Sequence, residues 1–296
     1  MQEPIVTPEL PDFDKLWNYG LPAATEAKFR ALMPCAEAPG NEDYCLQLRT
    51  QIARTYSLRG EFDEAHRILD DVENQLTDEL VVARIRYLLE RGRTWKSAGT
   101  CERACSLFHE AWELARANGE DFYAIDAAHM MGASTPTCDR LDWNAKAMEV
   151  AEASPDPHAR RWLGALYNNS GMAHLDAGRF EHALECFRRG VEFRETHGGG
   201  RKAKRIAKWC VAHTLRRMDR IDEALRMQRE LEIAWSEDGG DQDGFVFEEI
   251  AECLLWQGED EQARAYFKKA LPLLEKIRWI ADGEPDRLAR IRRRAG

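Results

Sequence analysis

The chain has 296 residues, of which 44% are hydrophobic, and this is enough to build a continuous core. Its net charge is −10, from 42 lysines and arginines against 52 aspartates and glutamates, which argues against a general nucleic-acid-binding protein. No apolar run approaches the ~18 residues of a membrane helix, and the N-terminal residues lack the basic and apolar regions of a signal peptide. The eight cysteines are scattered and expected to be reduced, so we expect a cytoplasmic protein.

The N-terminal part of the chain is predicted to be a flexible tail followed by a helical cap. Residues 1–12 are rich in proline and are expected to lack regular structure. In residues 13–43, Pro22 favours the first turn of a helix, and Phe29 and Leu32 fall on one face of it. This segment is therefore expected to cap the structure that follows.

A repeat of 39 to 41 residues runs through the rest of the chain. A small residue marks its second helix at Ala65, Ala104, Asn144, Ala183, Ala224 and Ala263. Five residues earlier, a predicted turn lies at Gly60, Gly99, Asp139, Gly178, Asp219 and Gly258. Four residues later, a large apolar residue stands at Leu69, Phe108, Met148, Phe187 and Phe267, with Gln228 departing from the pattern. A period kept over six units indicates an array of helix pairs.

The fourth unit shows the pattern most clearly. Gly171 lies on one helical face before the turn at Gly178, while Phe180, Ala183 and Phe187 share a face after it. This alternation of small and aromatic residues resembles a tetratricopeptide (TPR) repeat, in a long version of about 40 residues. The resemblance implies an all-α fold, a right-handed TPR superhelix (α-solenoid) of about six helix-turn-helix repeats. The opening of the chain also resembles bacterial TPR proteins of unknown function.

The predicted solenoid covers residues 44–280 and is followed by a basic C-terminal tail at 281–296. Pro136 is expected to kink or shorten the first helix of the third repeat, and the glycine-rich stretches 198–202 and 237–244 are expected to be connectors. The six repeats are placed at about residues 44–78, 80–118, 121–153, 159–196, 203–236 and 244–280.

No pattern in the sequence indicates a catalytic, cofactor or metal site. The three glycines before Arg201 and Lys202 are not preceded by a strand, as a phosphate-binding loop would be. Cys101 and Cys105 have a spacing that would suit two metal ligands, but Cys101 falls at a core position of the repeat, which favours packing. Residues 237–244 lack the order of calcium ligands. The chain is therefore not expected to be an enzyme or to carry a cofactor.

The resemblance implies that the first helix of each repeat lines a concave groove. Arginines in the groove are expected to hold acidic groups, Asn168 to bond a peptide backbone, and Trp209 to anchor an apolar side chain. An ordinary solvated surface is the alternative interpretation for each residue. The groove candidates are Arg54, Arg86, Arg93, His129, Asn168, Asn169, Trp209, His213, Arg216, Glu248 and Glu252.

The favoured function is a non-enzymatic protein- or peptide-binding scaffold that uses this groove, with no nucleic-acid or membrane partner. The alternative is a bacterial peptide-sensing regulator that controls a separate partner protein by changing the shape of its superhelix. A homodimer, formed by the basic tail of one copy and the acidic groove end of another, is a further hypothesis.

Overall fold

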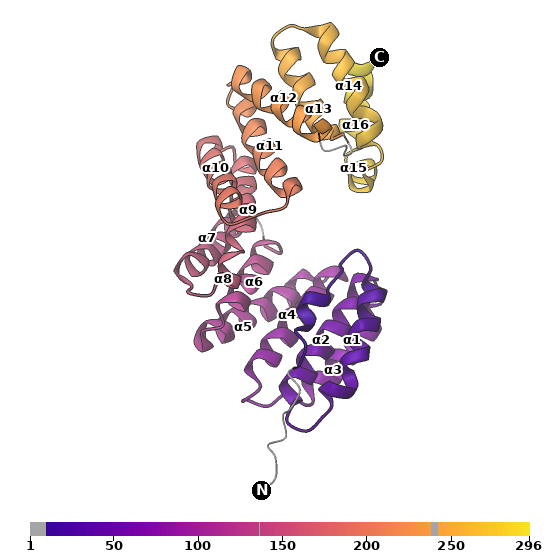
Figure 1. Ribbon diagram of the computed structural model, residues 1–296, viewed down its shortest axis with the longest axis vertical. Helices are drawn as coiled ribbons and strands as arrows, with labels where there is room; N and C mark the ends of the chain where they lie inside the picture. The colour runs from indigo at the N-terminus through magenta and orange to yellow at the C-terminus, as the bar shows by residue number, and fades with distance from the viewer. Residues whose placement is uncertain (1–9, 136, 238–241) are drawn as a thin grey trace. The chain divides into compact units, whose positions relative to one another are not determined.

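The computed structural model describes residues 10–135, 137–237 and 242–296, which form helices and no strand. The predicted tail at residues 1–12 therefore lies mostly outside the described residues, as do Pro136 and residues 238–241 of the second connector. The helices follow one another in pairs, and this confirms the prediction of an all-α helical-repeat fold (Figure 1). The chain divides into two compact units, Met1–Trp162 and Leu163–Gly296.

In the first unit, α2 packs against α4 and α4 contacts α6, so that these three helices form one layer. The helices α3, α5 and α7 each pack against the helix that precedes them. The elements are a 3-10 helix η1 (Phe13–Leu16), α1 (Pro22–Ala36), α2 (Glu42–Leu58), α3 (Phe62–Glu73), α4 (Val81–Ser97), α5 (Cys101–Asn118), α6 (Asp121–Gly132), α7 (Thr137–Ala153) and α8 (Pro157–Arg160).

The second unit repeats this arrangement. Helix α11 contacts α13, and α12, which lies between them in the sequence, packs against both. Its elements are α9 (Leu163–Asp176), α10 (Phe180–Thr196), α11 (Arg201–Arg217), α12 (Ile221–Glu237), α13 (Gly244–Trp256), α14 (Asp260–Leu274), α15 (Arg278–Gly283) and α16 (Pro285–Ala295). The predicted basic tail thus contains α16, which packs against α14 through its buried residues Leu288, Ile291 and Ala295.

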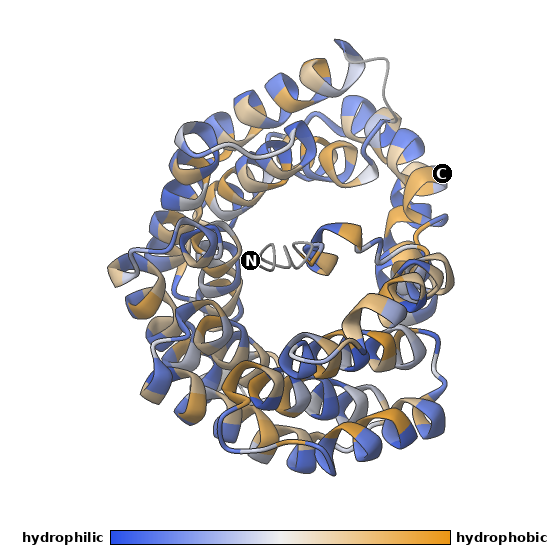
Figure 2. Ribbon diagram, turned by 60° about the horizontal axis from the view of Figure 1, so that its bottom comes forward, coloured by the Kyte–Doolittle hydropathy of each residue, from blue (hydrophilic) through white to orange (hydrophobic). Residues whose placement is uncertain are grey.

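The helices are amphipathic, with hydrophobic and hydrophilic residues alternating along each of them (Figure 2). Four phenylalanines that recur in the second helices are almost completely buried, namely Phe29, Phe108, Phe187 and Phe267. The helix pairs approach closely where a glycine faces such a ring. A Cβ atom added to Gly171 would lie 2.4 Å from the ring of Phe187, so this position accepts no side chain without rearrangement.

Residues with left-handed backbone end the first helix of most repeats. Gly178 has φ of 71°, and Asp219 adopts φ of 58°, which is unusual for a residue with a Cβ. The third repeat differs from the prediction, because Asp139 lies in the first turn of α7 and α6 already ends at Gly132. Cys101, which was predicted to pack in the core, is exposed because it is the first residue of α5.

Among the described residues, no helix has both the length and the hydropathy needed to cross a membrane.

Candidate functional site

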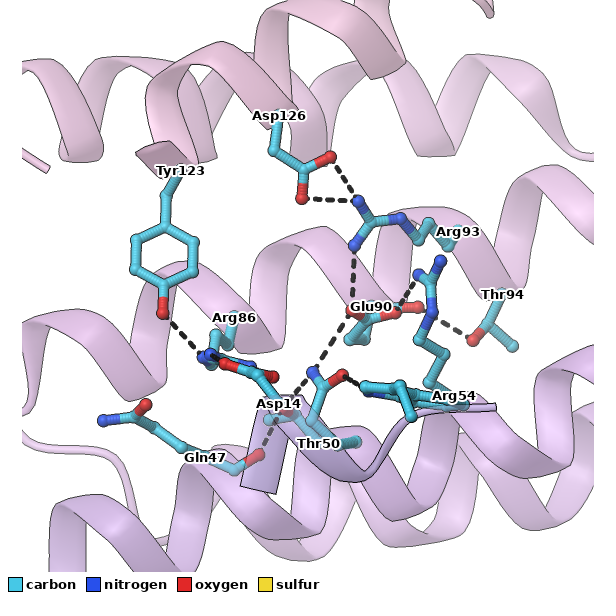
Figure 3. A network of polar contacts seen from close by, with 12 residues as sticks. Asp14, Gln47, Thr50, Arg54, Arg86, Glu90, Arg93, Thr94, Tyr123 and Asp126 are labelled. Atoms are coloured by element: carbon cyan, nitrogen blue, oxygen red, sulfur yellow. Dashed lines mark hydrogen bonds and ion pairs between the residues drawn. The ribbon is translucent and has the colours of Figure 1, made fainter. Parts of the chain in front are cut away.

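A chain of four charged side chains crosses the helix layer of the first unit (Figure 3). The carboxylate of Glu90 accepts bonds from Arg54 Nη1 and Arg93 Nη1, each at 2.8 Å. Arg93 also donates to Asp126 Oδ2 at 2.6 Å. The four residues come from α2, α4 and α6, so the ion pairs join the first helices of three successive repeats. Their charges alternate in sign and cancel.

Burial alone would raise the pKa of Glu90, but the neighbouring Arg54 and Arg93 outweigh it and hold that pKa below its usual range. Burial would likewise lower the pKa of Arg93, and Asp126 and Glu90 reverse this effect. The groups therefore stay ionised in a position where an unpaired charge would be costly. Arg54 and Arg93 were expected to offer charge to a ligand, whereas in the structure the chain's own carboxylates already balance them.

Arg86 on α4 holds a carboxylate that comes from a distant part of the chain. Its guanidinium donates two hydrogen bonds to Asp14, one of them from Nη1 to Oδ1 at 3.1 Å, and its Nε donates to Tyr123 Oη at 2.9 Å. The carbon at the centre of the guanidinium lies 5.0 Å from the centre of the Phe13 ring. Arg86 is buried, whereas Asp14 is exposed.

Residues 11–19, which we call the N-terminal strap, run along α2 and α4. Pro11 accepts a bond from Tyr44 Oη at 2.8 Å, and Trp17 Nε1 donates to Gln51 Oε1 at 3.0 Å. The Arg54 guanidinium lies over the rings of Trp17 and Tyr19, at 5.9 and 5.4 Å. The strap is therefore held by aromatic and charged side chains in the same region as the alternating ion pairs.

A pocket of about 280 Å³ opens beside the strap, within the first unit. On its far side Phe122 stacks on His158, with ring centres 4.2 Å apart and planes at 9°. Its wall combines aromatic with charged side chains, among them Tyr19, Arg54, Glu90, Phe122, His158 and Trp162. We call this pocket and the surrounding face of α2, α4 and α6 the first-unit groove.

His129 lies near the aromatic wall of this groove. Its ring centre is 5.3 Å from that of Trp162. Burial lowers the pKa of His129, and Arg93 also lowers it while Asp126 acts in the opposite sense. The imidazole is therefore kept neutral at physiological pH, which suits packing against an aromatic ring better than holding an acidic ligand.

The remaining candidate residues lie in the second unit, on α9, α11 and α13. Trp209 is half-buried, because its ring stacks on His213 at 5.0 Å between ring centres and meets Phe245 edge-on at 6.0 Å. Its buried Nε1 has no hydrogen-bond partner among the described residues. Asn168 Oδ1 accepts a weak bond from Cys210 Sγ at 3.7 Å, and Asn169 follows it on α9, also half-buried.

Glu249 organises the charges of α11 and α13. Its carboxylate accepts two bonds from Arg216 at 2.8 Å, and one of its oxygens lies 2.9 Å from His213 Nδ1. Burial would raise the pKa of Glu249, but His213 and Arg216 lower it to about 2. Burial would lower the pKa of Arg216, and Glu249 raises it instead. His213 and Arg216 are thus paired within the chain.

The acidic residues of α13 are covered by the C-terminal helix. Arg287 donates to Glu248 Oε2 at 2.5 Å, and Arg290 forms ion pairs with both Glu248 and Glu252. From the sequence, this basic tail was hypothesised to pair with the acidic groove end of a second copy. The structure instead forms the pairing inside one chain, because α16 folds back on α14 and brings its arginines to α13.

Sequence reasoning did not single out Asp14, Glu90 or Glu249, which organise the polar contacts. Glu90 and Arg93 are three residues apart on one helix, a spacing that brings opposite charges together and could have identified them. Among the described residues, no group of three or more histidine, cysteine, aspartate or glutamate side chains is placed to hold a metal ion.

The comparisons with known proteins find one repeat of a known family. Residues 164–197 match the family model of the tetratricopeptide repeat. The chain as a whole has a fold similar to that of solved TPR α-solenoids. The matched residues are those of the fourth repeat, α9 and α10.

Solved structures of similar fold have low sequence identity. A STAND signal-transduction ATPase with a TPR sensor from Pyrococcus horikoshii has a TM-score of 0.70 at 14% identity over 92% of this chain, which spans only 42% of that protein. RapI in its apo form has a TM-score of 0.68 at 12% identity, with 94% of this chain and 84% of RapI covered. The C-terminal part of a TPR protein from Cytophaga hutchinsonii has a TM-score of 0.56 at 14% identity, with 96% and 99% covered. No curated protein sequence matches significantly.

Proposed function

We propose that this protein is a non-enzymatic scaffold that binds a segment of a partner protein in the first-unit groove. The observation that carries the proposal is the N-terminal strap, which lies along α2 and α4. The strap is non-helical at both of its ends. A face that already holds this segment of the chain supports the proposal that it can hold a polypeptide segment of a partner. This is recognition by a helical-repeat surface, which uses aromatic and arginine contacts.

The pocket beside the strap would supply the contacts that fix the partner. Its aromatic wall, with Phe122, His158 and Trp162, suits an apolar or aromatic side chain. The second unit offers a separate surface at Asn168, Asn169 and Trp209.

The alternative is a sensor that controls a partner by changing shape. One structurally similar protein is described as carrying a TPR sensor. A scaffold and a sensor would use the same groove, and small-angle scattering of the full chain separates them. A scaffold keeps its radius of gyration when a ligand binds, whereas a sensor changes it.

The described cysteines are all free, which supports a reducing compartment such as the cytoplasm.

An affinity capture from a lysate of the source cells tests the proposal, with the full chain as bait and mass spectrometry as the readout. The first bait is the wild type, the second carries Arg54→Ala and Arg86→Ala, and the third carries Asn168→Ala and Trp209→Ala. A fourth bait with Arg293→Ala and Arg294→Ala controls for the loss of two exposed cations. We expect a protein that the first and fourth baits retain and the second loses. Equal retention by all four would refute a role for the groove.

A further inference from the structure

We infer that the N-terminal strap is a displaceable, tethered occupant of the first-unit groove, and that the groove selects a partner segment with an acidic residue followed three positions later by tryptophan. This inference rests on the proposed function and adds to it the class of ligand and its regulation. In the strap the two positions are Asp14 and Trp17, and both side chains bond residues of the inner helices, while Trp17 also stacks on Tyr19 of the strap.

The acidic position is required because Arg86 is buried and has few other partners. The side chain of Arg86 is 8% exposed, whereas that of Asp14 is 43% exposed. If the strap left without a replacement, the guanidinium would keep, among the three hydrogen bonds described above, only the one to the hydroxyl of Tyr123. A buried charge without its counterion is strongly unfavourable. A segment that displaces the strap must therefore bring a carboxylate of its own.

The tryptophan position follows from Gln51 and Arg54. Gln51 is buried, and its Oε1 accepts the bond from the indole N–H of Trp17. The guanidinium of Arg54 lies over the same indole. Phenylalanine at this position would keep the cation–π contact and leave Gln51 Oε1 without its donor, at the price of an unsatisfied buried acceptor. The groove thus distinguishes an indole from a plain apolar ring.

The strap can be displaced from Asp14 to Trp17 while its junction with α1 stays in place, because Asn18 anchors that junction separately. The backbone N–H of Asn18 donates to Thr25 Oγ1 at 3.1 Å, and Thr25 is completely buried in α1. The backbone of Gly20 is held by Asn18 Oδ1. A tethered segment competes at an effective concentration of about 1 mM. The wild-type chain should therefore bind a segment of the same chemistry more weakly than a chain whose strap has lost its contacts.

Fluorescence anisotropy of a labelled synthetic peptide, residues 10–21 of this chain, tests the inference with the full-length protein. The opened variant carries Asp14→Ala and Trp17→Ala and keeps Phe13, which packs in the core. We expect it to bind the peptide at least tenfold more tightly than the wild type. Adding Arg86→Ala should weaken the binding at least tenfold. Adding Arg84→Ala, which lies on the same helix as Arg86 and removes a surface ion pair with Asp78, should leave it unchanged.

A second peptide, with alanine at the two key positions, should bind none of the proteins. Thermal melts check that each variant folds, and the wild-type peptide should raise the melting temperature of the opened variant more than that of the wild type. Absence of peptide binding to the folded opened variant would overturn the ligand class. Equal affinity for wild-type and opened chains would overturn the competition by the strap. In either case the scaffold proposal stands as long as the affinity capture finds a partner that depends on the groove, and it fails separately if no partner does.

Discussion

Gly171 lies so close to Phe187 that the packing requires a residue without a side chain at this position. Gly171→Ala should gain about 1 kcal/mol from helix propensity, but its Cβ would lie 2.4 Å from the ring of a nearly fully buried Phe187. Overpacking of this kind costs about 1–3 kcal/mol. We expect a net loss of up to about 2 kcal/mol in the free energy of unfolding, measured by urea denaturation. Gly200→Ala, where an added Cβ meets nothing within 4 Å, is the control. A more stable Gly171→Ala protein would contradict the packing described.

Glu249 makes the stability of the second unit depend on pH. Its pKa is lowered from 4.5 to about 2, so its contribution is present above pH 4.5 and is lost as the pH falls toward 2. The shift corresponds to about 3 kcal/mol. Glu249→Gln should flatten the stability profile over this interval, measured by denaturant unfolding at a series of pH values. Glu261→Gln, at an exposed position of α14, should leave the slope as in the wild type. A slope that survives in Glu249→Gln would mean that another group titrates there.

The sequence located the groove arginines but not their partners, for a physical reason. Helical periodicity assigns Arg54, Arg86 and Arg93 to the inner face of their helices. It does not say which carboxylate of a neighbouring helix comes within hydrogen-bond distance, since this depends on how the helices are aligned in the fold. Glu90 is 36 residues from Arg54, and Asp14 is 72 residues from Arg86. The free basic surface expected from the sequence is therefore a set of satisfied ion pairs.

The C-terminal helix α16 is held to its unit by apolar contacts and by buried ion pairs with α13. Glu248 is 3% exposed, and it receives bonds from both Arg287 and Arg290. Removing the partners of a buried charge costs about 3–5 kcal/mol. Arg287→Ala with Arg290→Ala should therefore lower the free energy of unfolding of the second unit by about 3 kcal/mol. Arg293→Ala with Arg294→Ala removes the same charge from exposed positions and should change it by less than about 0.5 kcal/mol. Equal effects of the two pairs would show that α16 is not anchored by Glu248.

Helices that follow the repeat were predictable, while departures from it were not. The buried phenylalanines and the turn glycines recur at the repeat period, so local pattern and tertiary packing agree there. The packing of α16 against its own unit was not predicted, because charged residues dominate this short helix. Its few apolar residues, Leu288 and Ile291, form only a narrow stripe. Asp139 was assigned to a turn by the same period, although the third repeat reaches its second helix earlier.

The two ends of the chain act alike, each within its own unit. The strap brings a carboxylate to a buried arginine of α4, and α16 brings arginines to a buried carboxylate of α13. Each unit thus neutralises a charge of its inner helices with a terminal segment. Sequence reasoning could assign these charges to the inner helices. It could not identify the segments that cover them, because contacts between distant parts of a chain leave no local pattern in the sequence. Of the two terminal segments, the strap is the one that contributes an exposed carboxylate. We therefore infer that the strap, and not α16, is displaced.

Site-specific photo-crosslinking tests the binding of a partner in the first-unit groove most directly. Benzoylphenylalanine replaces Phe122 in the pocket wall, or Phe62 at the start of α3 as a position of similar exposure that does not line the pocket. The full chain is irradiated in lysate, and crosslinked peptides are identified by mass spectrometry. We expect one partner segment, containing an acidic residue three positions before a tryptophan, to be joined to position 122 and not to position 62. Crosslinks that are the same at both positions, or that form only at position 62, would contradict the proposal that the groove is the binding surface.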